Sequence, residues 1–278
     1  MRPSRESIPA LVNCYAHPPR SAEAARVSFQ IITDPWFYVF AIPAILITGI
    51  SKAGFGSGSG GIAVPMMSQV VAPSMAAGIM LPILIVMDIL SIRAYRGKWS
   101  AAALKPMVAP AVLGIVIGGL MFGVLSVKAT KALLGAIAVS FALYQLLPVL
   151  RDLKSWLPSP TRPWIWCTLS GFTSTLAHAG GPPCTIYLWP KNLDRVTFVA
   201  TTVVFFTLVN LVKLVPYALL GQLNFGNLAM ALVLMPLAPL GVWIGVRINR
   251  WLSEAAFKNT MLALTFVFGC RLLFEGLR

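Results

Sequence analysis

The chain has 278 residues, of which 58% are hydrophobic and 11% are charged, and its mean hydropathy is +0.80. Soluble domains carry about 25% charged residues, so this composition excludes a soluble protein and indicates a multi-pass membrane protein. Lys and Arg number 22 against 8 Asp and Glu. Without a nucleic-acid-binding motif, this excess is typical of cytoplasmic loops and predicts no nucleic-acid partner.

The cysteines Cys14, Cys167, Cys184 and Cys270 have no CxxC or Cys/His spacing, and the sequence contains no Walker A motif. We therefore expect no metal site, no cofactor and no ATP hydrolysis. Free thiols, mostly in the core, are the simplest interpretation of the four cysteines.

Residues 1–34 form a polar tail, and no apolar segment of a cleaved signal peptide precedes residue 36. From Trp36 onward, apolar runs alternate with short polar connections. Crossing a bilayer core takes roughly 20 helical residues. The runs long enough to do so are 74–92, 101–125, 128–150, 196–220, 228–246 and 255–274.

Two shorter runs, 62–72 and 182–189, are predicted to be half-helices, because at about 1.5 Å per residue they reach only roughly 16 and 12 Å. Each begins in or just after a glycine-rich stretch, KAGFGSGSGGIAVP at 52–65 and LAHAGGPP at 176–183. Non-helical backbone is tolerated at membrane depth only where it is buried in protein or lines a cavity. We therefore expect two re-entrant hairpins with these stretches as their tips. Their first arms would be 36–51 and 164–177.

The two halves of the chain correspond in order, with an offset that drifts from 120 to 127 residues. The matched glycines are Gly60-Gly61 with Gly180-Gly181, Gly97 with Gly221, and Gly114 and Gly118 with Gly241 and Gly245. Each unit would be one hairpin and three spanning helices, and an odd number of crossings inverts the second unit. The predicted fold is an all-α polytopic membrane protein with two inverted repeats, each a re-entrant helical hairpin plus three transmembrane helices.

Positive charges support this inversion, because Lys and Arg accumulate in cytoplasmic loops. Four lie between residues 93 and 105, whereas the corresponding connection 221–227 has none. The predicted division is a tail at 1–34, a first repeat at 35–150, a cytoplasmic linker at 151–162 and a second repeat at 163–278. We expect the protein in the bacterial inner membrane, in contact with lipid, and leave a homo-oligomer open.

The two tips carry the candidate substrate site. A half-helix that starts at the midplane presents unpaired N–H groups and about half a positive charge, and glycines let an anion approach the backbone. The alternative is that the glycines only allow close helix packing, which we prefer for Gly114, Gly118, Gly241 and Gly245. The candidate tip residues are Lys52, Ser57, Ser59, Gly60, Gly61, Thr175, His178, Gly180 and Gly181.

Two of these residues have open interpretations. His178 is either a buried neutral histidine bonded to a backbone carbonyl, or a ligand donor and proton carrier. Lys52 is either a helix-end lysine that extends to the membrane surface, or part of the site.

Charged residues also occur inside predicted spans, at Asp88 and Lys213, and Asn210 is the repeat counterpart of Asp88. Because a lone charge in the bilayer is costly, an Asp88–Lys213 pair is expected. One interpretation is that the pair is structural. In the other it is part of a site: Lys52 adds a second cation, so two positive charges face one carboxylate, and the remaining positive charge would bind a monoanion. In the functional interpretation Asn210 and Lys213 join the substrate site. Asp88 and His178 would then bind a coupling proton or sodium ion.

The chain resembles the sulfite exporter TauE/SafE family, also called the toluenesulfonate uptake permease group. The resemblance rests on GFGSGSGGIAVP in the first half, and on SGFTSTLAHAGGPP with NLVKLVPYALLGQLN in the second. It implies transport of small sulfur-containing anions such as sulfite, sulfoacetate or other organosulfonates, with export as the expected direction. No catalytic residue is expected.

Two other classes of protein are alternatives to a transporter. An intramembrane enzyme for an anionic lipid or phosphate would need an acid, a base or arginines near the tips. Neither tip contains Asp, Glu or Arg. A membrane assembly factor would need no polar residues at the midplane.

Overall fold

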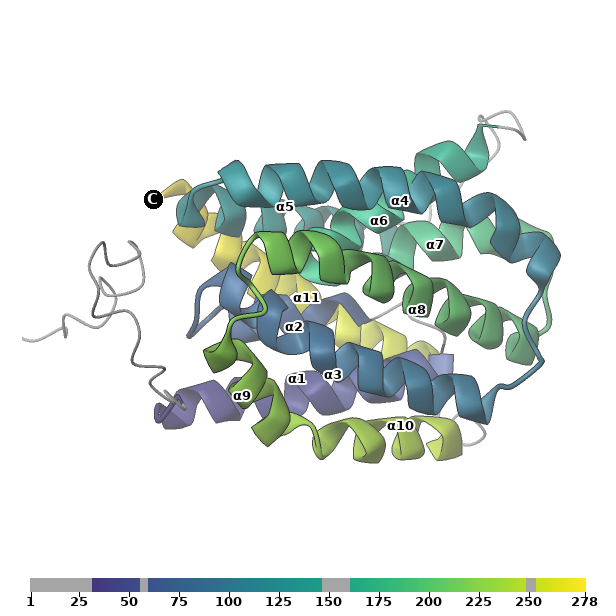
Figure 1. Cartoon of the computed structure of the whole chain (residues 1–278), viewed down its shortest axis with the longest axis horizontal. Helices are drawn as coiled ribbons and strands as arrows, with labels where there is room; N and C mark the ends of the chain where they lie inside the picture. The colour runs from purple at the N-terminus through teal and green to yellow at the C-terminus, as the bar shows by residue number, and fades with distance from the viewer. Residues whose placement is uncertain (1–31, 56–59, 147–160, 249–253) are drawn as a thin grey trace, which may run out of the picture.

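The computed structural model describes residues 32–55, 60–146, 161–248 and 254–278, and all the regular structure in these segments is helical (Figure 1). The all-α prediction is therefore confirmed for these residues. The first half contains α1 (Pro35–Phe55), the 3-10 turn η3 (Gly60–Ile62), α2 (Ala63–Met67), α3 (Pro73–Ala94), α4 (Ala101–Val124) and α5 (Val127–Leu146). The second half contains α6 (Arg162–Ala177), α7 (Gly181–Leu188), η5 (Trp189–Lys191), α8 (Arg195–Leu219), α9 (Phe225–Leu234), α10 (Leu237–Ile248) and α11 (Glu254–Leu277).

Five of the described helices, α1, α3, α4, α5 and α8, are long and apolar enough to cross a membrane, and the bent pair α9 and α10 makes a sixth candidate. A multi-pass membrane protein is therefore confirmed by length and composition. Helix α1 has 21 residues, so the run expected as a re-entrant arm is itself of spanning length. The run 228–246 is not one helix: α9 and α10 meet at 46°. Pro236 lies at this break, where it lacks the N–H that a continuous helix requires.

The first half-helix is shorter than predicted. Helix α2 has only five residues, and Ala72 has an extended backbone (φ −60°, ψ 142°) directly before Pro73, which begins α3. A residue directly before a proline disfavours the helical backbone conformation, so a helix does not continue through Ala72. Just after α2, the side-chain amide of Gln69 donates to the Pro65 carbonyl at 2.9 Å. In the second half, α7 and η5 extend over the predicted run 182–189.

Helices from the two halves pack reciprocally: α1 lies along α10, α4 along α6 and α5 along α11, with α3 against α8 (Figure 1). Glycines make two of these contacts close. A Cβ at Gly49 would lie 2.9 Å from the Gly241 carbonyl carbon, and one at Gly114 would overlap the Thr168 carbonyl oxygen. The packing interpretation of Gly114 and Gly241 is therefore confirmed. The inverted repeat itself stays a prediction. It would make the contact of α1 with α10 equivalent to the contact of α6 with α4, and both contacts are present.

Candidate functional site

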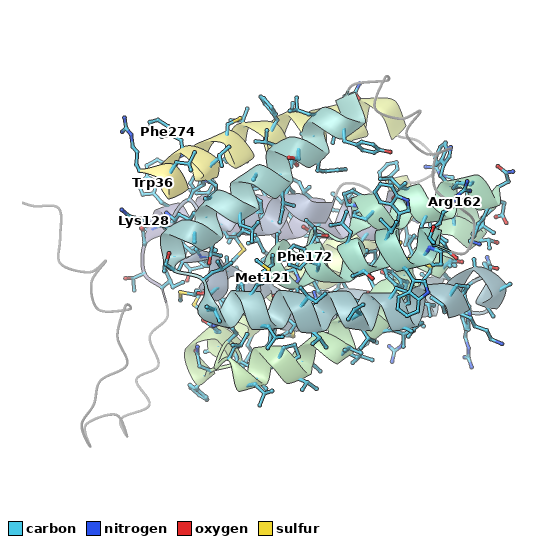
Figure 2. The ribbon with its side chains drawn as sticks, turned by 90° about the horizontal axis from the view of Figure 1, so that it is seen from above. Trp36, Met121, Lys128, Arg162, Phe172 and Phe274 are labelled. Carbon is cyan, nitrogen blue, oxygen red and sulfur yellow. The ribbon has the colours of Figure 1, made fainter. Side chains whose placement is uncertain are left out.

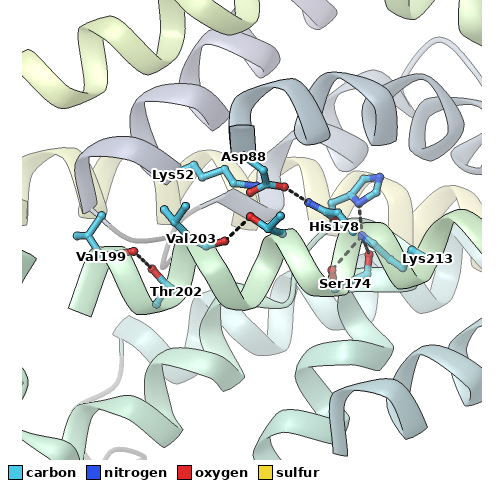
Figure 3. A network of polar contacts seen from close by, with 10 residues as sticks. Lys52, Asp88, Ser174, His178, Val199, Thr202, Val203 and Lys213 are labelled. Carbon is cyan, nitrogen blue, oxygen red and sulfur yellow. Dashed lines mark hydrogen bonds and ion pairs between the residues drawn. The ribbon is translucent and has the colours of Figure 1, made fainter. Parts of the chain in front are cut away.

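In its second half, helix α8 carries the side chains of Asn210 and Lys213, which are fully or almost fully buried. Residues three apart share one face of a helix. This face of α8 joins two polar clusters, one around Asp88 and one around Lys213 (Figure 3).

The first cluster is built around the buried Asp88 carboxylate of α3. Lys52 Nζ, in the last turn of α1, lies 2.6 Å from Asp88 Oδ1, and Asn210 Nδ2 donates to Asp88 Oδ2 at 2.7 Å. Only 5% of the Lys52 surface is exposed. The interpretation of Lys52 as a surface-seeking lysine is therefore wrong.

The predicted Asp88–Lys213 ion pair is also wrong, because the carboxylate is taken by Lys52 instead. Lys213 reaches the C-terminal end of α6, where it donates to the Ser174 carbonyl at 3.0 Å, to Ser174 Oγ at 3.1 Å and to His178 Nδ1 at 2.8 Å. Three acceptors match the three hydrogens of an ammonium group. The carbonyl end of a helix also carries partial negative charge, which favours a cation there. All three acceptors are formally uncharged.

His178 ends α6 in the left-handed conformation, with φ 52° and ψ 26°. A non-glycine residue there is strained by roughly 1–2 kcal/mol, so its side-chain contacts must offset that strain. The Nε2 atom lies 3.0 Å from the Ala77 carbonyl oxygen. Since a carbonyl only accepts, Nε2 carries the hydrogen and Nδ1 is left to accept from Lys213. The network thus assigns a neutral imidazole with a defined tautomer, and His178 is more exposed than Ser174 or Lys213.

The two tips touch each other. A Cβ at Gly61 would lie 2.8 Å from Ala179 Cβ, and one at Gly180 would lie 2.5 Å from the Ser170 carbonyl oxygen. Ser170 Oγ also donates to the Gly180 carbonyl at 2.6 Å. Close contact between protein groups is therefore the immediate reason for both glycines.

The two helix starts present fewer unpaired N–H groups and a weaker dipole than expected. Helix α2, with five residues, has little dipole to offer. Helix α7 begins at Gly181 and continues with Pro182 and Pro183, which lack two of the N–H groups that a helix start leaves unpaired. The hydrogen-bond donors around the tips are therefore mostly side chains, and Lys213 is the charged donor among them at the end of α6.

The remaining predicted site residues are Ser57, Ser59, Gly60 and Thr175. Ser57 and Ser59 lie outside the described residues, and Gly60 begins η3. Thr175 donates its hydroxyl to the Gly171 carbonyl at 2.9 Å and packs against α4, because a Cβ at Gly118 would lie 3.0 Å from Thr175 Cβ.

Sequence reasoning missed Tyr217. Tyr217 is fully buried, donates to the Thr175 carbonyl at 2.7 Å and has its ring centre 6.0 Å from that of His178. One signal was available: Tyr217 follows Tyr95 by 122 residues, the offset that also relates Asn210 to Asp88.

The family model for "Sulfite exporter TauE/SafE" matches residues 41–272, most of the chain. No curated protein and no solved structure matches. The match includes both tips and every residue of the two polar clusters. The chain thus belongs to the TauE/SafE sulfite exporter family, whose members are membrane transporters of sulfur-containing anions and not enzymes.

Proposed function

We propose that this protein is a secondary transporter that exports sulfite, sulfoacetate or another small organosulfonate across a bacterial inner membrane. The observation that carries the proposal is the environment of Lys213. Its amino group is fully buried, and all of its hydrogen-bond partners are uncharged.

Charge balance favours a monoanionic substrate. The two clusters contain two cations, Lys52 and Lys213, and one anion, Asp88, which Lys52 neutralises at 2.6 Å. One formal positive charge is left on Lys213. Burying an uncompensated charge is costly, so a substrate with one negative charge gains affinity by removing that cost.

Anion binding at Lys213 would exchange one neutral acceptor for a charged one. Ser174 Oγ and His178 Nδ1 are the replaceable partners, because each can turn toward another donor or acceptor, whereas the Ser174 carbonyl is held in the last turn of α6. Hydrogen bonds to an ionised acceptor are roughly twice as strong as neutral ones. A sulfonate oxygen would therefore compete well for the lysine.

Substrate entry requires movement of the surrounding helices, since Ser174 and Lys213 are buried. Reciprocal packing of α1 on α10 and of α4 on α6 supports alternating access by two related bundles around the tips. Asp88 is the proposed coupling site, together with His178. A proton or sodium ion on the carboxylate would weaken its pair with Lys52. Ser91 Oγ, one turn from Asp88 on α3, is buried without a hydrogen-bond partner among the described residues and offers another oxygen.

The first test is thermal-shift screening of the purified protein with sulfite, sulfoacetate, taurine, thiosulfate and simple carboxylates, because a bound ligand stabilises by mass action. We expect stabilisation by one or more sulfur anions. Lys213→Met should remove that shift, while Lys98→Met, at an exposed loop position, should keep it. If no sulfur anion stabilises the wild-type protein, or if Lys213→Met responds as wild type does, this assignment is wrong.

A further inference from the structure

A cavity of about 650 Å³ lies away from the two polar clusters, between the first half of α4, the start of α6 and the end of α7 with η5. Its volume is in the range of small-molecule sites, about 300–1,000 Å³. It lies at the end of the bundle where Arg162 is found, opposite the end with Trp36, Lys128 and Phe274 (Figure 2).

The lining of this cavity is cationic. Lys105, Arg162 and Lys191 come from three different elements and converge on it, and none of the described residues that line it is an Asp or Glu. Lys191 Nζ also lies 4.8 Å from the centre of the Tyr187 ring, a cation–π contact that holds the lysine at the cavity wall. This arrangement favours an anionic ligand, and the planar Arg162 guanidinium suits a phosphate in particular.

The rest of the lining is apolar, and it continues toward the lipid. Pro106, Ala109 and Pro110 form one wall, and Trp164, 53% exposed, lies at the rim. Tryptophan is enriched where a membrane meets water. Further along the same face of α4, at helical spacing, Leu113 and Ile117 are exposed. A ligand in the cavity is thus offered cations at one end and an apolar strip at the other.

From this combination we infer that the cavity binds the phosphate headgroup of an anionic phospholipid, with an acyl chain along Leu113 and Ile117 of α4. A free anion would use the three cations but would gain nothing from the apolar strip. Positive charge at this end of the bundle also identifies it as the cytoplasmic end, where anionic headgroups attract Lys and Arg.

The test is native mass spectrometry of the full chain in detergent with phosphatidylglycerol or phosphatidylcholine of identical acyl chains. We expect phosphatidylglycerol to bind more tightly, by about fivefold for each contributing cation. The triple variant Lys105→Gln, Arg162→Gln, Lys191→Gln should reduce that preference to the phosphatidylcholine level. The matched control Arg93→Gln, Arg96→Gln, Lys98→Gln removes three exposed charges from the same end, outside the cavity, and should keep it.

Two further measurements separate a lipid from a free anion and guard against misfolding of the triple variant. Trp164→Ala leaves the charges intact and should weaken phosphatidylglycerol binding. Inorganic phosphate and glycerol 1-phosphate should compete poorly with the lipid. The inference is overturned if wild type does not discriminate between the two lipids, or if the triple variant binds phosphatidylglycerol as the control does. It is equally overturned if the soluble phosphates displace the lipid at equal concentration and Trp164→Ala has no effect.

Discussion

Tyr217 donates a hydrogen bond of 2.7 Å to the backbone carbonyl of Thr175, two residues before α6 ends. Its first-half counterpart is Tyr95, which donates at 2.6 Å to the carbonyl of Ala53, two residues before α1 ends. Tyr217 follows Tyr95 by 122 residues, and Thr175 follows Ala53 by the same number. Tyr217 therefore connects α8 to α6, and Tyr95, directly after α3, connects α3 to α1. In each case the second helix leads into a tip.

Removing either hydroxyl should loosen the corresponding tip. Tyr217→Phe and Tyr95→Phe each remove a described hydrogen bond to a backbone carbonyl, so we expect each to lower the free energy of unfolding by about 1–3 kcal/mol. In an inverted repeat the two bonds lie toward opposite membrane faces, so the variants should alter transport in opposite directions. Unfolding in detergent and transport from each side of proteoliposomes measure the two effects. The control is Tyr38→Phe, which removes the hydrogen bond from Tyr38 to the Ile32 carbonyl, at the end of α1 that lies away from the tip. Equal effects from all three variants would contradict the proposed equivalence of Tyr95 and Tyr217.

The Lys52–Asp88 pair should show strong coupling. Removing one partner of a buried ion pair costs about 3–5 kcal/mol, because the other charge is left uncompensated. We expect Lys52→Met and Asp88→Asn each to destabilise the protein strongly, and the double variant to cost much less than their sum. A double-mutant cycle on the free energy of unfolding measures this, and simple additivity would show that the two charges do not depend on each other.

The same variants separate coupling from stability. Asp88→Asn with Lys52→Met restores charge balance at this cluster while it removes the proposed coupling carboxylate. Transport by the double variant should therefore still saturate with the anion but lose its dependence on the proton or sodium gradient. Retention of wild-type gradient dependence would place the coupling site elsewhere.

His178 should contribute to substrate binding indirectly, by holding the Lys213 ammonium group through Nδ1 while Nε2 stays bonded to the Ala77 carbonyl. His178→Ala removes both nitrogens, whereas His178→Gln keeps a donor and an acceptor. We expect the alanine variant to bind the anion more weakly than the glutamine variant, by about tenfold for one lost hydrogen bond to a charged group. Binding titrations and a pH profile of transport test this. An alanine variant with the wild-type rate and pH profile would leave the histidine a purely structural role.

Contact between the two tips can be tested by exchanging one methyl group. In Gly61→Ala the new Cβ would lie 2.8 Å from Ala179 Cβ, and overpacking of this kind costs about 1–3 kcal/mol. Ala179→Gly removes the opposing methyl, so the double variant should recover much of the stability and transport of wild type. Thermal unfolding and uptake measure the recovery, and a double variant no better than Gly61→Ala would indicate that the tips do not meet in this way.

The helix that carries Asn210 and Lys213 begins with an acidic cap. Asp194 Oδ1 accepts from the backbone N–H groups of Thr197 and Val196, and hydrogen bonding, first to Thr197, lowers the pKa of Asp194. Because the folded state favours the charged form, the cap contributes stability above the unfolded pKa of about 3.9 and loses it as pH falls through the lower folded value. Asp194→Ala should therefore lower the melting temperature at neutral pH, and the difference from wild type should shrink below about pH 4. Asp194→Asn, which still caps a helix, should melt close to wild type at neutral pH, and a melting temperature equal to that of Asp194→Ala would argue against the cap.

Among the expected elements, the long apolar helices were predicted best from the sequence. The run predicted at 74–92 is α3 at Pro73–Ala94, and that predicted at 196–220 is α8 at Arg195–Leu219. Such helices are predictable because apolar length is a property of each segment alone. The length of the first half-helix and the break between α9 and α10 were predicted less well. A proline in or beside an apolar run changes the backbone locally, and the run itself continues through it in the sequence.

The sequence by itself determined that this is an all-helical membrane protein of the TauE/SafE family, and that Lys52, Asp88, His178, Asn210 and Lys213 are its unusual polar residues within apolar surroundings. The membrane class follows from composition, the family from the two glycine-rich stretches and the run after them, and the importance of the five polar residues from the cost of polar groups in a bilayer. Only the tertiary structure decided which charges pair: Asp88 with Lys52 rather than with Lys213, and Lys213 with Ser174 and His178. Partner choice depends on distances of a few ångströms between side chains on different helices, and those distances are set by how α1, α3, α6 and α8 pack together.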